Sequence, residues 1–168
     1  MLWRVWGFGV GNTAIEHALE IANGFVGLPV FRAARGVGSY MTLDVGAWTS
    51  VELSGGHEGH RGERSIWIRG AVWRLDVGSE ISVDVLSSTD AAIDAAFAGL
   101  EGDIVRSISL NELGSLSIDG DDWSLRAFPV LSEDDNWVLF DLSNYYAFSG
   151  PNGVIGSNRP VENDSPPS

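Results

Sequence analysis

The chain has 168 residues, of which 44% are hydrophobic and 20% are charged. This length is typical of one domain, since domains usually span about 100–200 residues, and the composition excludes wholesale disorder. The chain contains no cysteine, which excludes a disulfide framework, a thiolate metal site and a cysteine nucleophile.

The chain is strongly acidic. It has 23 Asp and Glu against 10 basic residues, all of them arginine, and a formal net charge of −13. Because nucleic acids and anionic membrane surfaces bind proteins largely through basic groups, we expect neither as a partner. We expect a protein with a basic surface, since complementary charge accelerates association. The alternative is that the acidic surface only keeps the chain soluble, and the charge gives no indication of the oligomeric state.

The chain begins with an apolar segment, residues 1–11, that has neither the basic region nor the cleavage site of a signal peptide. Glu16 and His17 follow it, so the chain is interrupted by polar residues well short of the roughly 20 residues that span a bilayer. We therefore expect a cytoplasmic protein.

Two segments have the pattern of short amphipathic helices. The first is predicted to begin at Asn12-Thr13 and to end at Gly24, and the second to begin at Thr89-Asp90 and to end near Gly102. Their apolar faces are formed by Ile15, Ala18, Leu19 and Ala22 in the first helix and by Ile93, Phe97 and Leu100 in the second. Each face is wide enough to cover part of a sheet.

Most of the remaining chain has the composition and alternation of β-strands. Strands are predicted at 39–45, 64–76, 81–85, 115–118, 123–128 and 137–142. Gly70 is predicted to form a bulge within the long second strand. Asp119-Gly120 is predicted to form the tight turn of a hairpin, and the apolar segment 137–142 is predicted to be a central strand. Four tryptophans within these strands are expected in the core: Trp67, Trp73, Trp123 and Trp137.

These elements predict a single α+β domain over residues 1–150, strand-rich, with a mostly antiparallel sheet and two amphipathic helices. Residues 151–168 are rich in Pro, Asn, Gly, Ser and acids, and we expect them to form a flexible tail.

The spacing also indicates an internal two-fold repeat, with half-repeats 12–88 and 90–150. Ala14-Ile15-Glu16 in the first predicted helix matches Ala92-Ile93-Asp94 in the second, and Gly38-Ser39 matches Gly114-Ser115 before a strand. A chance likeness between two amphipathic helices is the alternative.

Two stretches resemble small uncharacterised bacterial proteins. The stretch 38–46 contains Thr42-Leu43-Asp44, and 66–75 is an apolar strand that ends in Trp73-Arg74-Leu75. The stretch 113–153 is similar to another small bacterial domain of unknown function. The resemblance implies a role as the immunity partner of a secreted toxin. Together with the net charge of −13 and the lack of catalytic motifs, it favours a non-enzymatic protein-binding domain that covers a basic toxin surface. It carries over no functional residues.

No catalytic constellation or cofactor site is predicted. The glycine-rich segment Gly7–Asn12 lacks the last glycine of the dinucleotide fingerprint and the lysine of the triphosphate loop. His57, His60 and Glu63 are weak candidates for a metal site, but the histidines lie three apart rather than four, and the glycines around them favour a mobile hairpin loop.

The predicted partner-binding residues combine an aromatic anchor with a rim of acids. Trp48 lies on a predicted turn and is the tryptophan most expected to be exposed. The predicted patch joins Trp48 and Phe148 to Asp121, Asp122, Asp134 and Asp135. The alternative function is an enzyme or a small-ligand-binding domain that uses the His57–Glu63 segment or the exposed aromatic residues.

Overall fold

The computed structural model describes residues 12–38, 40–53, 56–130, 135–141, 146–150, 153 and 155–158. Within this part of the chain, two helices lie among thirteen strands, and every strand pair is antiparallel. The predicted α+β class with mostly antiparallel sheet is therefore confirmed.

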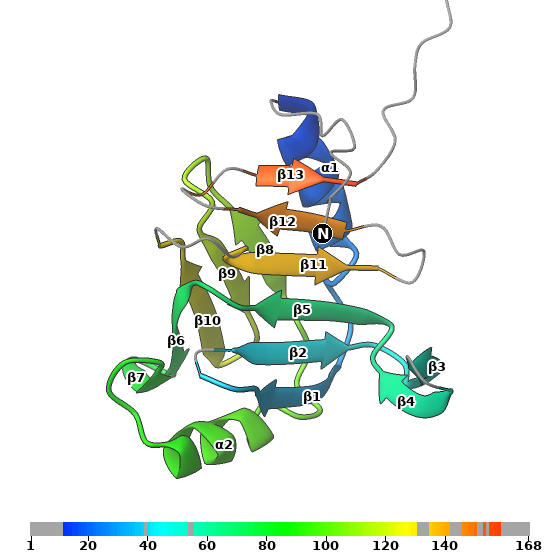
Figure 1. Cartoon of the computed structure of the whole chain (residues 1–168). Helices are drawn as coiled ribbons and strands as arrows, with labels where there is room; N and C mark the ends of the chain where they lie inside the picture. Colours follow the sequence, from blue (N-terminus) through cyan, green and yellow to red (C-terminus); the bar gives the residue numbers. More distant parts are fainter. Residues whose placement is uncertain are drawn as a thin grey trace, which may run out of the picture.

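The strands form a larger sheet, a smaller sheet and a separate hairpin (Figure 1). The larger sheet has the order β1 (Val30–Arg35), β2 (Met41–Val45), β5 (Arg64–Ile68), β11 (Trp137–Phe140), β12 (Tyr146–Ser149) and β13 (Ile155–Ser157). The smaller sheet has the order β7 (Glu80–Asp84), β6 (Val72–Val77), β10 (Trp123–Phe128), β9 (Leu116–Asp119) and β8 (Ser107–Leu110). The hairpin consists of β3 (Thr49–Leu53) and β4 (His57–Arg61).

One hydrophobic core lies between the two sheets. Successive residues of a strand point to opposite faces, so every second side chain points inward. Ile66 and Leu139 line the core from the larger sheet, while Leu75 and Leu125 line it from the smaller sheet, and all four are fully buried. The strand prediction for 137–142 as central is confirmed, because β11 lies between β5 and β12.

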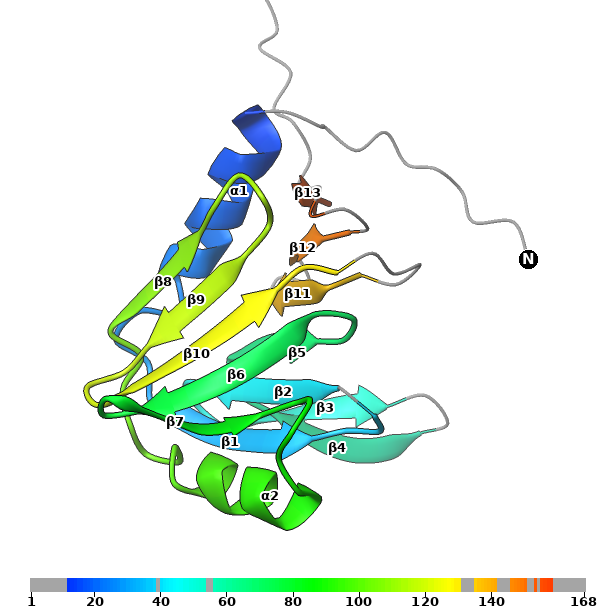
Figure 2. The same cartoon turned by 90° about the vertical axis from the view of Figure 1, so that its left-hand side faces the viewer.

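The two helices close the open sides of this sandwich (Figure 2). Helix α1 (Asn12–Asn23) packs on β8 of the smaller sheet and on β12 and β13 of the larger one, while α2 (Asp90–Ala98) packs on β7 and β1. Both helices were predicted, and the Thr89 hydroxyl caps α2 by accepting from the Ala92 N–H at 3.3 Å. By covering edge strands, the helices shield backbone groups that would otherwise be open to pairing. No helix among the described residues is long and apolar enough to span a bilayer.

The segments that follow the two helices lie side by side. Pro29, between α1 and β1, forms an antiparallel bridge with Ile104, between α2 and β8. Backbone hydrogen bonds of 2.7–3.0 Å flank this bridge, from Gly27 to Val105, from Val30 to Asp103, from Gly102 to Val30 and from Val105 to Leu28. Gly27 and Gly102 both have positive φ, of 86° and 92°, which glycine adopts without strain.

The predicted single strand 64–76 is wrong. β5 and β6 belong to different sheets, and the chain crosses between them at Gly70. The N–H groups of Arg69 and Gly70 donate to carbonyls of the 135–136 segment, at 3.0 and 3.1 Å. A bulge and a change of sheet both reverse which residues point inward, so the sequence pattern does not separate them.

The hairpin predicted over 115–128 is confirmed as β9 and β10, but its turn differs. Asp121 and Asp122 form the tip, since the Gly120 N–H donates to the Trp123 carbonyl at 2.9 Å. Gly120 does not have a positive φ; a Cβ there would overlap the Trp123 indole. Glycine is therefore required here for space and not for its backbone freedom.

The boundary predicted at residue 150 is also wrong. β13 pairs with β12, and Ile155 is buried in the core. The Asn158 carboxamide oxygen accepts from the Tyr146 N–H at 2.7 Å, so the ordered domain extends at least to this residue. The composition argument failed because one core isoleucine and main-chain pairing are enough to order a short strand. The predicted flexibility of residues 159–168 falls outside the described residues.

Candidate functional site

The predicted metal candidates lie on or beside the β3–β4 hairpin. Residues 57–61 form a strand, which corrects the prediction of a mobile loop. Positions 57 and 60 are three apart and therefore fall on opposite faces of β4, while the half-buried Glu63 side chain lies against Gly46. Within the described residues, no group of three or more His, Cys, Asp and Glu is placed to hold a metal ion.

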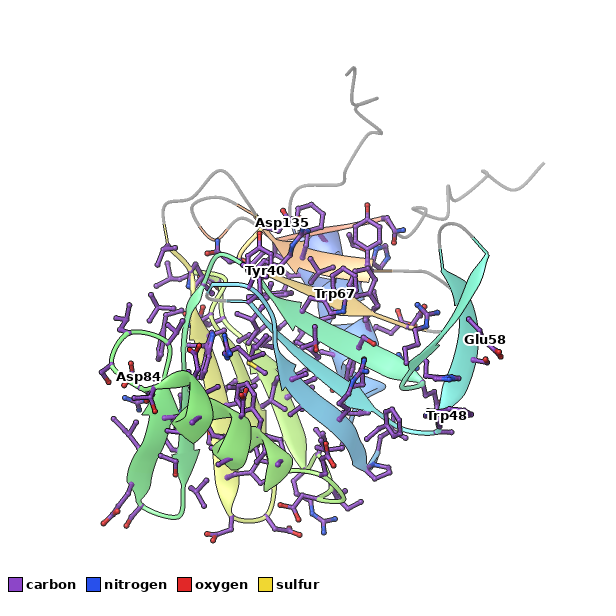
Figure 3. The ribbon with its side chains drawn as sticks, turned by 60° about the horizontal axis from the view of Figure 1, so that its bottom comes forward. Tyr40, Trp48, Glu58, Trp67, Asp84 and Asp135 are labelled. Carbon is purple, nitrogen blue, oxygen red and sulfur yellow. The ribbon has the colours of Figure 1, made fainter. Side chains whose placement is uncertain are left out.

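Trp48 is exposed, as expected, with 57% of its surface accessible. Its indole stacks on the His60 ring at the base of the hairpin, with 4.0 Å between ring centroids and 23° between planes. The stack leaves Trp48 as an accessible aromatic group at the corner of the molecule (Figure 3).

The predicted acidic patch is not assembled. Asp121 and Asp122 lie at the end of β6 near Gly78, whose N–H donates to the Asp122 carbonyl at 2.8 Å. Asp135 lies at the other end of β6, where its carbonyl accepts from Gly70. The six residues of β6 separate the two groups by about 17 Å. Asp134 is outside the described residues.

Asp121 is also engaged locally. The hydrogen bonds that Arg106 donates to its carboxylate, at 2.7 and 2.8 Å, hold the pKa of Asp121 below its ordinary value. This acid is therefore paired with a cation of the same chain, and it contributes little net charge to a rim around Trp48 or Phe148.

The structure instead gathers aromatic side chains on the outer face of the larger sheet. We call this surface, made of Trp67, Phe140, Tyr146 and Phe148, the aromatic face. Its ring centroids follow one another at 4.9, 6.0 and 6.1 Å. Figure 1 looks onto this side of the sheet, and no described helix or strand lies across it. Trp67 is 42% exposed, which corrects its expected place in the core; Trp73, Trp123 and Trp137 are buried there as predicted.

Strand register explains why these residues share one face. Trp67 pairs with Val138, which pairs with Phe148, and Phe148 pairs with Gly156. The Phe148 ring lies over Gly156, where a Cβ would collide with it. Trp67 lies between the buried Ile66 and Ile68, so the alternation of this strand was the signal that could have placed it outside.

A buried carboxylate lies beside the aromatic face. Asp44 is 2% exposed and accepts from Arg32 through Nε at 3.1 Å and a terminal nitrogen at 2.6 Å. The Ser65 hydroxyl donates to its other oxygen at 2.5 Å. The network joins β1, β2 and β5, and it leaves the carboxylate without the open side that acid–base chemistry requires.

The outer face of the smaller sheet has a shallow cavity of about 250 Å³. Ser109, Ser115, Ser117, Arg126 and Phe128 are among its lining residues, which include no His, Asp or Glu. Arg126 donates to Asp76 at 2.7 Å. The cavity offers hydroxyl groups but no base that would activate one of them.

No family model, no curated protein and no solved structure matches the chain. The function is therefore argued from the aromatic face, whose rings lie on the outer side of the larger sheet.

Proposed function

We propose that the chain is a non-enzymatic protein-binding domain whose aromatic face receives a protein with a basic surface. The observation that carries the proposal is the row of rings on the central strands of the larger sheet, with Trp67 42% exposed. Trp and Tyr dominate the energetics of protein interfaces, because they bury a large area at a low cost in conformational entropy. The net charge of −13 favours a basic partner.

The rim of the aromatic face supports this choice of partner. Asp135 and Asp141 lie at the two ends of β11, the strand that carries Phe140. An apolar centre with a charged rim is typical of protein interfaces. An immunity protein that covers a basic toxin surface in the cytoplasm is the specific form that we favour, because such a role requires acidity and no catalysis.

We also propose that the chain is an internal two-fold repeat. In the first half, α1 is followed by β1, β2 and β5, which run from edge to centre of the larger sheet, and by β6 and β7, which run from centre to edge of the smaller one. In the second half, α2 is followed by β8, β9 and β10 in the smaller sheet and by β11, β12 and β13 in the larger one. Apart from the β3–β4 hairpin in the first half and β13 in the second, the strands of the two halves follow each other in the same order with the sheets exchanged.

Individual residues support the repeat. Asp44 on β2 binds Arg32 and Ser65 of the neighbouring strands, and Asp119 on β9 accepts from Ser107 at 2.8 Å and from Ser124 at 2.6 Å. The buried tryptophans hold corresponding places as well: Trp137 opens β11 opposite β5, and Trp73 lies on β6 opposite β10.

The repeat strengthens the case for the aromatic face. The smaller-sheet counterparts of Trp67, Phe140, Tyr146 and Phe148 are Arg126, Asp76, Ile81 and Asp84. The same strand arrangement is therefore compatible with a polar outer face. Exposed rings in the larger sheet are not a requirement of the fold, which supports a role for them in binding.

The test uses a photo-crosslinking amino acid in place of Trp67 in the native host, with Ser117 on the smaller sheet as the control position. We expect position 67 to crosslink a basic protein that position 117 does not. With that protein purified, Trp67→Thr is expected to weaken binding about 30-fold, as loss of an interface hot spot does, while Ser117→Thr leaves it unchanged. Absence of a crosslink at position 67, or equal crosslinking at both positions, would refute the proposal.

A further inference from the structure

The β3–β4 hairpin is the largest difference between the two halves of the proposed repeat. It occupies residues 46–63, between β2 and β5, and we call this segment the arm. The corresponding link between β9 and β10 is the short turn of residues 120–122. Both links join neighbouring antiparallel strands, so a short turn is sufficient to connect them. The arm is therefore additional to what the fold requires.

The arm stands beside the aromatic face. Figure 3 shows it rising at one end of the sheet that carries Trp67, with Trp48 near its base and Glu58 along β4. A partner seated on the aromatic face would meet the arm at this end. The two surfaces together form a corner and not a flat patch.

The strands of the arm have unpaired edges. β3 and β4 pair with one another, and within the described residues neither pairs with a third strand. An isolated two-stranded hairpin is marginally stable in water, and an open edge accepts an extended segment of another chain through main-chain hydrogen bonds. The edge strands of the two sheets each pack against a helix, β8 and β13 against α1 and β1 and β7 against α2. The strands of the arm pair only with one another within the described residues.

The charge of the arm indicates the chemistry of its occupant. Residues 46–63 contain Glu52, Glu58 and Glu63 against a single arginine, Arg61. The register places Glu52 directly opposite Glu58. The Ser50 hydroxyl donates to the Glu58 carboxylate, which holds this charge on the arm. A lysine or arginine side chain from an added strand would pair with this carboxylate.

We infer that the arm binds an extended, basic segment of the partner by strand addition, while the aromatic face holds the partner's apolar surface. This inference rests on the proposed function, since it describes how the same partner is held. Carboxylates of the arm pair with basic side chains of the segment, and its main chain continues the two-stranded sheet.

The first experiment places the photo-crosslinking amino acid at Glu58 and compares the captured protein with the one captured at Trp67. We expect the same basic protein at both positions. Hydrogen exchange with that purified protein is then expected to slow in the β3 and β4 amides, and in the absence of the partner these amides are expected to exchange faster than those of β5 and β11. Unchanged exchange in the arm on binding would overturn strand addition.

The second experiment shortens the arm by replacing Thr49–Arg61 with Asn-Gly, since Thr49 and Arg61 pair at its base. The variant is expected to keep its melting temperature and to bind at least 10-fold more weakly. Glu52→Gln with Glu58→Gln is expected to weaken binding about 10-fold. Glu80→Gln removes one charge from an exposed acid on β7, far from the arm, and is the control for the effect of each charge removed.

The outcomes separate the two proposals. Weaker binding in Trp67→Thr together with unchanged binding in the shortened-arm variant would overturn the arm inference and leave the proposed function in place. No captured protein at Trp67 would overturn both. If Glu80→Gln weakens binding as much as the double variant, the arm has no specific role and the effect is one of total charge.

Discussion

The outer faces of the two sheets carry opposite chemistry at positions that the proposed repeat makes equivalent. On the larger sheet, one cross-strand row consists of Arg32, Asp44, Ser65, Phe140 and Tyr146. On the smaller sheet, the corresponding row consists of Ser107, Asp119, Ser124, Asp76 and Ile81. In both rows the second residue is a carboxylate held by its neighbours, Asp44 or Asp119. The rows diverge at the fourth residue, which is Phe140 in the first and Asp76 in the second.

This difference shows which part of the molecule the fold depends on. The inner faces of both sheets are mostly apolar, with the buried Ser149 and Ser157 as exceptions on the larger sheet. The smaller sheet satisfies its outer face with ion pairs, such as Arg126–Asp76 at 2.7 Å and Arg74–Asp76 at 3.3 Å. Ion pairs close to the surface typically add only about 0–1 kcal/mol each to folding stability. The side chains on the outer faces of the sheets can therefore differ without loss of the fold, and they can serve binding.

The largest expected effect tests whether Trp73 and Trp137 are equivalent within the core. Trp73 and Trp137 are both buried almost completely, so each change to alanine is expected to lower the free energy of unfolding by about 3–5 kcal/mol. Urea denaturation measures both values. Similar losses in the free energy of unfolding would support the equivalence of the two tryptophans. A variant with near wild-type stability would contradict it.

A smaller effect is expected at the strand that extends the larger sheet. Ile155 on β13 is 6% exposed, and Ile155→Ala is expected to cost about 2–4 kcal/mol. A chain shortened to end at Asn158 is expected to keep the wild-type melting temperature, whereas one that ends at Gly150 should lose several degrees. Equal melting temperatures for the two shortened chains would show that β13 adds no stability.

The two carboxylates at corresponding positions, Asp44 and Asp119, are expected to contribute different amounts to the free energy of unfolding. Asp44→Asn removes charge-assisted bonds to Arg32 at a buried position and is expected to cost about 2–3 kcal/mol. Asp119→Asn weakens only two bonds from serine hydroxyls and is expected to cost about 1 kcal/mol. Chemical denaturation of the two variants gives the order, and a larger loss at Asp119 would contradict the assignment.

The smallest expected effect concerns pH. The Arg106 hydrogen bonds lower the pKa of Asp121, so their contribution to stability is present above the ordinary pKa of 3.8 and is lost as the pH falls below it. Asp121→Asn is therefore expected to be slightly less stable than wild type near pH 6, and the difference is expected to narrow as the pH falls toward 2.5. Denaturation curves at both pH values and at raised salt measure the difference. A gap that persists in acid would point to a packing role for Asp121.

The sequence was sufficient to predict the elements whose own residues determine them. Both helices have an apolar stripe, β10 alternates between apolar and polar residues, and β11 is a continuous apolar run, so their type followed from local pattern. β1, β8 and β12 were not predicted, because strands such as Ser107–Leu110 and Tyr146–Ser149 are short and partly polar. Their ladder partners, which lie far away in the sequence, determine these strands.

The candidate site could be predicted only in part. Trp48 was expected at the surface and lies there, while Phe148 was named and lies on the aromatic face. Trp67 and Tyr146 were missed, since their grouping depends on β5, β11 and β12 being neighbours. The charged loops were predicted to lie close together on the assumption that they flank neighbouring strands. β10 and β11 belong to different sheets, so Asp122 and Asp135 lie at opposite ends of β6.

The placement of the helices has a consequence for how the chain folds. α1 lies against β8, β12 and β13, all from the other half of the chain, and α2 lies against β1 and β7. Each half thus completes the packing of the other, and such non-local closure makes folding slow, in the range of about milliseconds to seconds. Until β11 reaches β5, the first half exposes an open apolar edge. Separate halves are expected to be insoluble alone and to become soluble only when they are produced together.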